Sequence, residues 1–529
     1  MRSATIDHAT AAAARGRAGC EERALKVLIV VGHPRSDSLS QALANAYRDG
    51  ARRAGAEVQQ LELAGLAFDP NVRTREFAAQ FVEDDIRRAQ TLIAWADHLV
   101  FVYPTWWGTM PALLKGFLDR VLAPGFAFGE TANPGYVPLL AGKSAEVLTT
   151  MDTPRWVWRW IYGAPGDRAM ARAILGFCGV EMAQIARFGP VRGCSLEQRR
   201  AWIAAAAARG QRLRSGPFSR RQRLGRKVAS WLKAIRLQFY PMTWLAYAIG
   251  ALAAARITDR FDGAAFWSGL LCLFFIEVAT VLANEHYDFE SDRRNRNHGP
   301  FTGGSRVLVT GALSFREVRR GVAAALALAL LGALWLIAST GAGAAIVLLL
   351  LGAMTALALG YTVPPLKLSY RGLGELDVGV THSAGAILCG FVFQGGSWTA
   401  AEPWLLSLPL FLAVLPGITL SGVPDHDADR AVGKRTLAIR AGIRGAYGIA
   451  ALCAILAAAA ALGLQQLSGL GHLFTGIEYG VVPHAALVLY LLARQTRREP
   501  QAMRIDGLML ASLSYTLWFV AVPLWHLLP

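Results

Sequence analysis

Hydrophobic residues follow two different patterns along the chain, and the change falls near residue 236. Before it, short apolar runs rich in β-branched residues alternate with segments of helical periodicity. Such alternation predicts an α/β domain with a doubly wound parallel sheet and helices on both of its faces. The expected strands are 26–31, 57–63, 98–103, 145–150 and 182–188, and the expected helices are 40–54, 84–96, 112–121, 168–177 and 196–212.

After residue 236 the apolar runs become long and contain few charged residues. Each is close to the ~20 residues that an α-helix needs to cross a bilayer. This pattern predicts an all-α membrane bundle of nine transmembrane helices. The expected spans are 237–257, 263–283, 320–339, 342–360, 376–396, 403–423, 445–464, 478–493 and 506–526.

Lysine and arginine residues are concentrated in every second connection between these spans. The connections 284–320, 361–375, 424–444 and 491–505 contain 7, 2, 5 and 4 of them, whereas the opposite connections contain only Arg260. Cytoplasmic loops of membrane proteins carry such an excess of positive charge. We therefore expect a multi-pass protein of the cytoplasmic (inner) membrane, with the N-terminal domain and the basic loops inside the cell and the C-terminus outside.

Composition and charge predict the limits of an N-terminal tail, two domains and the linker between them. Residues 1–25 are rich in Ala and Arg and lack the apolar core of a secretory signal, so we expect a disordered tail. The two domains are expected at 26–215 and 237–529, joined by a basic linker at 216–236. The linker contains the sequence SRRQRLGRK and suits an interfacial helix on an anionic membrane surface. The net charge of +17 thus indicates a lipid bilayer, and not nucleic acid, as the partner.

Two groups of acidic residues follow apolar spans on the same predicted side of the membrane. Asn284, Asp288 and Asp292 are each four residues apart, which on a helix places their oxygen atoms along nearly one face. Asp425 and Asp429 repeat this spacing after the sixth span. Carboxylate pairs suit hard divalent cations, and such cations suit a diphosphate. The alternative is that these acids are loop charges that pair with neighbouring arginines.

Two loops fall at the expected carboxyl edge of the sheet, where ligands of such domains bind. The loop 32–40 offers free N–H groups, hydroxyls and the start of a helix, which together suit a phosphate. It lacks the GxGxxG fingerprint of a nicotinamide-binding Rossmann domain. The loop 103–108 contains two adjacent tryptophans, which either border a flat ring or cover the sheet edge.

The sequences VLIVVGHPRSDSLSQAL and VFVYPTWWGTMPALLKGFLDRVL resemble the flavodoxin-like NAD(P)H:quinone oxidoreductase family over roughly residues 26–190. The resemblance implies a flavin (FAD or FMN) that NAD(P)H reduces and that passes electrons to a quinone, and a homodimer formed through this domain. The third flavin loop departs from the family, with TTMDTP at 149–154 in place of a Gly-rich turn. The resemblance assigns the phosphate side of the flavin to His33, Ser38, Leu39 and Ser40, and its isoalloxazine ring to Pro104, Thr105, Trp106 and Trp107.

The sequences NxxxDxxxD at 284–292 and DHDADRAVGKRTL at 425–437 resemble the two aspartate-rich motifs of the UbiA family of membrane prenyltransferases. YTVPPLKLSYRG at 361–372 is similar to the loop between spans four and five of that family. The resemblance covers residues 236–529 and implies Mg²⁺-dependent transfer of a prenyl group from a prenyl diphosphate to an aromatic acceptor. It assigns Mg²⁺ to Asp288, Asp292, Asp425 and Asp429, a supporting oxygen to Asn284, phosphate contacts to Lys367, Lys434 and Arg296, and substrate contacts to Tyr361 and Tyr370.

Together these expectations predict a bifunctional enzyme of quinone biosynthesis. A prenyl cation attacks electron-rich rings, so the reductase would supply a hydroquinone, and tethering would raise its local concentration. The run GPFTGGSRVL at 299–308 favours a naphthoquinone (menaquinone) type. In one alternative the N-terminal domain is a flavin-binding regulatory or docking module without turnover, and in another the membrane half is a transporter or channel. Glu277 and His382 fall inside expected spans and are interpreted as satisfied groups of the bundle interior.

Overall fold

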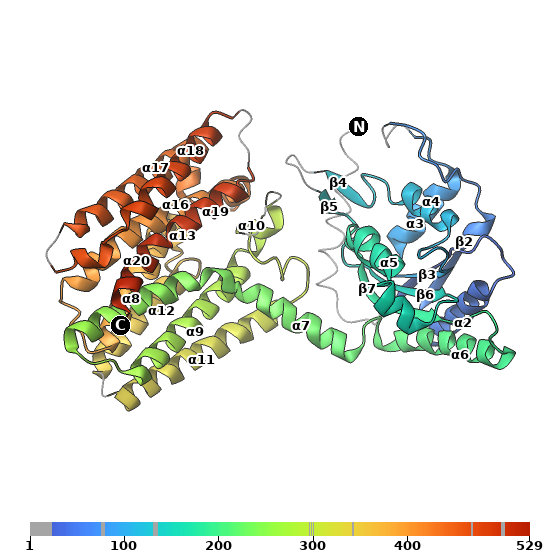
Figure 1. The fold of residues 1–529 in the computed structure, drawn as a ribbon, viewed down its shortest axis with the longest axis horizontal. Coiled ribbons are helices and arrows are strands. Elements are labelled where there is room, and N and C mark those ends of the chain that lie inside the picture. Colours follow the sequence, from blue (N-terminus) through green and yellow to red (C-terminus); the bar gives the residue numbers. More distant parts are fainter. Residues whose placement is uncertain are drawn as a thin grey trace. The chain divides into compact units, whose positions relative to one another are not determined.

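The computed structural model describes residues 24–75, 80–130, 136–295, 297, 299, 301–340, 343–466, 469–498 and 503–528. The chain divides into two compact units, Met1–Gly225 and Arg226–Pro529, which are described separately below (Figure 1). The division falls inside the basic linker predicted at 216–236. Helix α7, Arg220–Ile235, carries the chain from one unit to the other.

A parallel sheet of five strands forms the centre of the N-terminal unit. Its strands are β1 (Lys26–Val31), β2 (Glu57–Glu62), β3 (His98–Pro104), β6 (Ser144–Thr150) and β7 (Glu181–Phe188), in the order β2-β1-β3-β6-β7. Each neighbouring pair is parallel. This order is the flavodoxin-like doubly wound topology, in which the chain reverses direction across the sheet between β1 and β3. The predicted fold class is confirmed for this unit.

Helices cover both faces of this sheet (Figure 1). On one face, α2 (Leu39–Arg53) and α6 (Leu196–Arg212) bury Tyr47, Ala206 and other apolar residues against the strands. On the other, α3 (Asp84–Trp95) and α4 (Ala112–Val121) do the same. Glycines let α2 and α6 approach closely, because a Cβ atom on Gly50 would lie 2.0 Å from the Ala207 carbonyl oxygen.

Polar residues form a buried network on the α2–α6 side of the sheet. Glu146 accepts hydrogen bonds from Arg209 at 2.7 Å and from the Tyr47 hydroxyl at 3.0 Å. The ring of His98 lies 2.8 Å from the Ser144 hydroxyl and is fully buried. Each ionisable group therefore has a partner, as buried polar groups require.

Three features of the N-terminal unit were not predicted. A short antiparallel hairpin joins β4 (Phe128–Glu130) and β5 (Tyr136–Pro138). The helix expected at 168–177 begins earlier, as α5 (Pro165–Arg168), and continues as a π-helix, η4 (Ala169–Gly176). A second π-helix, η3 (Val157–Ile161), precedes it. Periodicity near 3.6 residues does not separate an α-helix from these wider turns.

The C-terminal unit is helical throughout, and a helix lies at each of the nine predicted spans. Among the described residues, six helical segments are long and apolar enough to cross a membrane, so the count of nine crossings stays a prediction. The helices of this unit after α7 are α8 (Pro241–Thr258), α9 (Gly263–Tyr287), α10 (Phe289–Arg294), α11 (Phe315–Thr340), α12 (Ala344–Gly360), α13 (Leu368–Arg371), α14 (Gly374–Val380), α15 (Ala386–Phe393), α16 (Glu402–Ala431), α17 (Leu437–Gln465), α18 (Glu478–Thr496), α19 (Asp506–Tyr515) and α20 (Trp518–Leu527).

Small residues and prolines shape the packing of these helices. A Cβ atom on Gly250 of α8 would lie 1.9 Å from the Ile387 carbonyl oxygen of α15, and one on Gly390 would lie 2.0 Å from the Tyr247 carbonyl oxygen. Such close backbone approach through small residues is typical of membrane helix pairs. Helix α16 contains three internal prolines, Pro409, Pro416 and Pro424, the last directly before Asp425.

Candidate functional sites

The first aspartate motif lies where two helices meet. Helix α9 ends at Tyr287, and Asp288, with φ −91° and ψ 4°, caps its end and precedes α10. The expected single helix through Asn284, Asp288 and Asp292 is therefore wrong. The amides of Asp288 and Asp292 still donate to carbonyls four residues earlier, at 2.8 and 2.9 Å, so the chain bends while the spacing is kept.

Lys434 lies between the two aspartate motifs. Its Nζ is 2.9 Å from Asp288 Oδ2 and 3.1 Å from Asp429 Oδ1, and all three side chains are buried. A left-handed turn at Gly433, with φ +81°, brings the chain back so that the Lys434 amide donates to the Asp429 carbonyl. Burial alone would lower the pKa of Lys434, because it disfavours the ammonium ion. The negative charges of Asp288 and Asp429 have the larger effect and raise the pKa of Lys434 well above its usual range.

Helices α10 and α16 also bring the motifs together through neutral side chains. The Ser291 hydroxyl donates to Asp429 Oδ1 at 2.5 Å, and Asn295 Nδ2 donates to Asp425 Oδ1 at 2.5 Å. Both aspartate motifs therefore share one polar centre, as predicted from their placement on one side of the membrane. Asp427, by contrast, is exposed and pairs with His426.

A loop after α10 encloses Asp292. Gly304 has φ +66°, and a Cβ atom there would lie 2.1 Å from Asp292 Oδ2, so only glycine fits. Burial, with the charges of Glu285 and Asp288, raises the pKa of Asp292 to about 8. Arg306 donates to the backbone carbonyl of Asp292 at 2.6 Å and thereby fixes the loop.

The loop between α12 and α14 supplies two aromatic rings beside Lys434. The Nζ atoms of Lys367 and Lys434 lie 4.8 and 5.8 Å from the centre of the Tyr370 ring. The Tyr361 carbonyl accepts hydrogen bonds from the amide and hydroxyl of Ser369, at 3.0 and 2.8 Å, which closes the loop. Burial raises the pKa of the Tyr361 hydroxyl, which also senses the charges of Lys434 and Asp288. The structure thus gathers these predicted residues around Lys434, whereas Arg296 lies outside the described residues.

The polar centre retains oxygens without partners. Among the described residues, Asn284 Oδ1 and Asp288 Oδ1 are buried and accept no hydrogen bond. Over the same residues, no three His, Cys, Asp or Glu side chains are spaced to hold a metal ion. The carboxylates face Lys434, Ser291 and Asn295 instead. The free oxygens and the donor type suit a hard divalent cation, and the Mg²⁺ site stays a prediction.

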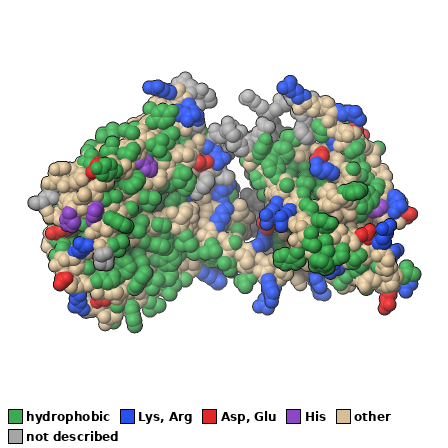
Figure 2. Space-filling model, in the orientation of Figure 1, with side chains coloured by type: hydrophobic (Ala, Val, Ile, Leu, Met, Phe, Trp, Pro, Cys, Tyr) green, Lys and Arg blue, Asp and Glu red, His purple; other side chains and the backbone are tan. Residues whose placement is uncertain are grey.

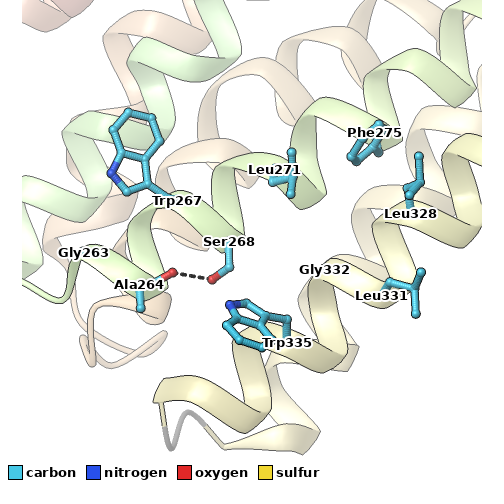
Figure 3. Close-up of a pocket in the computed structure, with 10 residues that line it drawn as sticks. All are labelled: Gly263, Ala264, Trp267, Ser268, Leu271, Phe275, Leu328, Leu331, Gly332 and Trp335. Carbon is cyan, nitrogen blue, oxygen red and sulfur yellow. Dashed lines mark hydrogen bonds between the residues drawn. The ribbon is translucent and has the colours of Figure 1, made fainter.

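A separate cavity is lined by residues of α9 and α11 (Figure 3). Its volume is about 600 Å³ and its lining is almost entirely apolar. Ser268 carries its one hydroxyl, which donates its hydrogen to the Ala264 carbonyl at 2.5 Å within the helix. None of the predicted site residues lines it; the lining residues are Gly263, Ala264, Trp267, Ser268, Leu271, Phe275, Leu328, Leu331, Gly332 and Trp335.

In the N-terminal unit, the first predicted loop joins β1 to α2. The ring of His33 is buried, and its Nδ1 accepts from the Arg35 amide at 3.0 Å. Ser38 caps α2 by accepting from the Gln41 amide at 3.2 Å, and Leu39 begins the helix. Ser40 Oγ is buried without a partner among the described residues, directly at this helix start. A free hydroxyl beside a helix N-terminus suits a phosphate.

The second loop follows β3 and is tightly folded. Thr105 bonds to β6 through its amide, at 2.7 Å to the Thr150 carbonyl, and Trp106 and Thr109 exchange backbone hydrogen bonds at 2.8 and 3.0 Å. The Trp106 ring meets His33 edge to face at 5.7 Å, so the two predicted loops touch. Trp107 has φ +49° and its side chain is fully exposed. The tryptophans therefore do not cover the sheet edge as a buried plug.

Hydrogen bonds to neighbouring segments fix the third loop, at 149–154. The Asp152 carboxylate accepts from the Arg192 amide at 2.7 Å, and the Thr149 and Thr105 hydroxyls are 2.7 Å apart. Behind it, Asp167 accepts from the Trp158 indole at 2.9 Å and pairs with Arg187. The three loops therefore lie together at the carboxyl edge of the sheet.

Sequence reasoning missed several residues of the membrane site. Asn295 and Arg306 contact the aspartate motifs, and the Glu285 carboxylate accepts from the Ser305 amide. Arg236 directly follows α7, and its positive charge favours the ionised form of the Asp288 carboxyl group. Arg306 lay within the quoted GPFTGGSRVL run, but a loop sequence does not reveal which side chain turns inward.

Comparison with known proteins agrees with this division. Residues 25–213 match the flavodoxin-like fold, and residues 243–520 match the UbiA prenyltransferase family. An uncharacterized NAD(P)H oxidoreductase of Haemophilus influenzae is 30% identical over 190 residues, covering 35% of this chain and 93% of that protein. Human ribosyldihydronicotinamide dehydrogenase (quinone) is 31% identical over 215 residues, covering 35% and 90%. The apo structure of a UbiA homologue from Aeropyrum pernix K1 aligns at TM-score 0.41 and 22% identity, covering 54% and 98%.

Proposed function

Because this chain belongs to the UbiA prenyltransferase family and carries a flavodoxin-like NAD(P)H:quinone oxidoreductase domain before it, we propose that one polypeptide prepares and prenylates an aromatic acceptor. The N-terminal unit reduces a quinone, of naphthoquinone type, to its hydroquinone. The C-terminal unit, a multi-pass membrane domain, transfers a prenyl group from a prenyl diphosphate to that ring. The observation that carries the proposal is the meeting of both aspartate motifs at Lys434.

In the transferase unit, Asp288, Asp292, Asp425 and Asp429 would hold Mg²⁺, with Asn284 offering a neutral oxygen. When bound, the metal supplies positive charge that stabilises the departing diphosphate. Lys434 adds a fixed cation at the same place, and the Nζ of Lys367 lies 4.8 Å from the centre of the Tyr370 ring. Arg296 is a further phosphate contact by resemblance. Tyr361 and Tyr370 would line the prenyl diphosphate site with aromatic surface and help to exclude water.

In the reductase unit, His33, Ser38, Leu39 and Ser40 would hold the phosphate side of a flavin, and Pro104, Thr105, Trp106 and Trp107 would border its ring. A bound flavin supplies the transfer of a hydride from NAD(P)H and of electrons to the quinone. The chain's own contribution is orientation, since hydrogen bonds to β6 and the His33–Trp106 contact fix both loops. A homodimer through this unit remains part of the proposal.

The two activities follow each other chemically. A quinone ring is electron-poor and reacts slowly with a carbocation, whereas a hydroquinone ring is electron-rich. Tethering keeps an easily reoxidised hydroquinone near the second site. The distribution of Lys and Arg supports a cytoplasmic membrane location with both sites facing the cytoplasm.

The test uses the full chain in nanodiscs with Mg²⁺, a prenyl diphosphate and an oxidised naphthoquinone, followed by chromatography of prenylated product. We expect product only when NAD(P)H is present, and none from Asp288→Ala. The matched control is Asp427→Ala, which removes an exposed carboxylate of the same motif. Equal product without NAD(P)H would refute the coupling. Flavin binding without NAD(P)H oxidation would instead favour the regulatory module.

A further inference from the structure

A group of polar side chains with unused hydrogen-bonding capacity lies between α8 and α9, apart from the aspartate motifs. Glu277 of α9 accepts a hydrogen bond from the Thr243 hydroxyl through Oε1, while its Oε2 is buried without a partner. The Trp244 indole N–H faces this carboxyl group without completing a hydrogen bond of good geometry. The Tyr240 hydroxyl is likewise buried without a partner. These absences refer to the described residues alone.

Unused polar atoms at this depth need an explanation. Buried polar atoms are almost always satisfied, and an unpaired carboxylate oxygen costs more than most. Ionisable residues in membrane helices are rare and face the bundle interior or a cavity. The interpretation of Glu277 as a satisfied interior group is therefore incomplete, because only one of its two oxygens is bonded.

Helix geometry places this carboxyl group toward the proposed active site. Seven residues separate Glu277 from Asn284, which is close to two full turns, so both project from nearly the same face of α9. The separation along the axis is about 10 Å, toward the membrane interior. Glu277 therefore lies on the apolar side of Asn284, whose own Oδ1 is also free among the described residues.

Aromatic rings surround the group. Tyr240 and Trp244 are 6.1 Å apart between ring centres, and Phe274 lies 5.7 Å from Tyr240 and 6.1 Å from Trp244. A flat ring bound against this aromatic cluster would meet one acceptor at Glu277 and donors at Trp244 and Tyr240. That combination suits a ring bearing a hydroxyl group.

We propose that Glu277, Trp244 and Tyr240 bind the hydroxyl edge of the aromatic acceptor, with the acceptor O–H donating to Glu277 Oε2. The proposal rests on the proposed function and adds the acceptor site to it. The ligand presents a phenol or hydroquinone hydroxyl here, because the O–H can donate to the unpaired Glu277 oxygen.

The geometry gives Glu277 a role in proton transfer. As a ring carbon attacks the prenyl carbon, the new C–C bond forms and the C–O bond to the diphosphate breaks with its electron pair. Glu277 takes the hydroxyl proton, and the ring becomes a dienone. The ring C–H proton then leaves with the diphosphate, Glu277 returns its proton to the oxygen, and the ring is aromatic again. Overall one proton accompanies the diphosphate, and nothing is oxidised or reduced.

The test measures binding as well as turnover. Full-length protein in nanodiscs, with Mg²⁺ and a non-reacting prenyl thiodiphosphate, is titrated calorimetrically with 1-naphthol and with its methyl ether, and empty nanodiscs correct for partition into lipid. Glu277→Gln should weaken 1-naphthol binding at least about tenfold, as expected when a buried hydrogen bond is lost, and leave the ether unchanged. Trp244→Phe, which keeps an aromatic ring, should weaken 1-naphthol in the same direction.

Controls separate this inference from the proposed function. Glu402→Gln removes a carboxylate at the start of α16 and should bind both ligands as the wild type does. Thiodiphosphate affinity should be equal in the wild type and in Glu277→Gln. If Glu277→Gln and Trp244→Phe each weakened the binding of 1-naphthol and of its methyl ether equally, or weakened neither, the acceptor site would be refuted. The proposed transferase activity would be unaffected by that result. A wild type that does not bind the thiodiphosphate would refute the proposed function itself.

Discussion

At the scale of single residues, the membrane site is organised by one buried cation. Lys434 is the point where carboxylates from α9–α10 and from α16 meet, and its side chain is almost fully buried. Attraction at such a site is strong because little water screens it, but each charge has lost its hydration. The balance is favourable only while the partners remain together. Removing one partner therefore destabilises the protein by more than the intact ion pair stabilises it.

Lys434→Met should destabilise the C-terminal unit by about 3 kcal/mol when divalent cations are absent, because Asp288 and Asp429 lose their counter-charge while buried. The measurement is thermal unfolding of the full chain in detergent with EDTA. Lys233→Met, an exposed lysine on α7, is the control and should unfold as the wild type does. Identical unfolding of the two variants would show that Lys434 does not stabilise the site.

His98 makes the stability of the N-terminal unit depend on pH. Burial lowers the pKa of His98 from 6.5 to about 4, so the folded chain keeps the ring neutral where the unfolded chain protonates it. The unfolded state then binds more protons below pH 6.5, and the free energy of unfolding falls as the pH falls from 6.5 towards about 4. The full loss corresponds to about 3 kcal/mol.

Pulse proteolysis of the full chain in urea, from pH 7.5 to 4.5, reports this loss as a falling urea midpoint. In His98→Gln the midpoint should fall less steeply, because glutamine does not titrate. The change in slope is the decisive quantity, since the substitution also alters packing against Ser144. Parallel pH profiles for both proteins would contradict the assignment to His98.

At the scale of elements, close contacts between backbones fix how helices pair. Helices α8 and α15 touch at Gly250 and Gly390, where no Cβ atom fits. Gly390→Ala should force the two helices apart and lower the unfolding temperature of the C-terminal unit, with a loss of roughly 1–3 kcal/mol. Gly352→Ala, on α12 with open space around it, is the matched control and should be neutral or slightly stabilising. Equal effects of the two substitutions would show that the contact is unimportant.

The sequence predicts elements well where one simple pattern dominates. All five strands of the central sheet begin and end within about one residue of their predicted limits. The central strands β1, β3 and β6 are short buried runs bounded by turns, whereas the edge strands β2 and β7 contain both buried and exposed residues. The convergence of the two aspartate motifs also follows from sequence, since each follows a long apolar helix on the same side. These features depend on local composition.

Other features depend on contacts that no local pattern encodes. The end of α9 at Tyr287 and the left-handed turn at Gly433 decide where Asp288 and Lys434 meet. The inward direction of Arg306 depends on its φ of +61° within a loop. In the π-helices η3 and η4, each hydrogen bond spans one residue more than in an α-helix. Each is set by tertiary packing, which outweighs intrinsic preference.

At the scale of the whole molecule, the chain joins two compact units, each with its own hydrophobic cores. Hydrophobic side chains also cover much of the visible surface of the helical unit (Figure 2), as a membrane domain requires. The sequence reveals this division because hydropathy changes abruptly at the linker. In the proposed reaction sequence, physical connection would give the second site a high local concentration of the product of the first.

A protease site inserted at 216–219 and cut after folding should therefore lower the yield of prenylated product at low quinone concentration, while each separate activity persists. The uncut insertion protein is the control. Product and free hydroquinone are measured together by chromatography under low oxygen. If cutting changes neither quantity, the tether has no role in transfer between the sites.

The three prolines within α16 have a mechanical consequence. A proline has no amide hydrogen, so the carbonyls of Leu405, Leu412 and Leu420 lack their usual helical donor. The backbone hydrogen bonding of α16 is therefore interrupted at three points, and the last of these lies immediately before Asp425. The segment that bears Asp425 and Asp429 therefore has fewer backbone hydrogen bonds to the rest of α16, and its position depends on side-chain contacts with Ser291, Asn295 and Lys434.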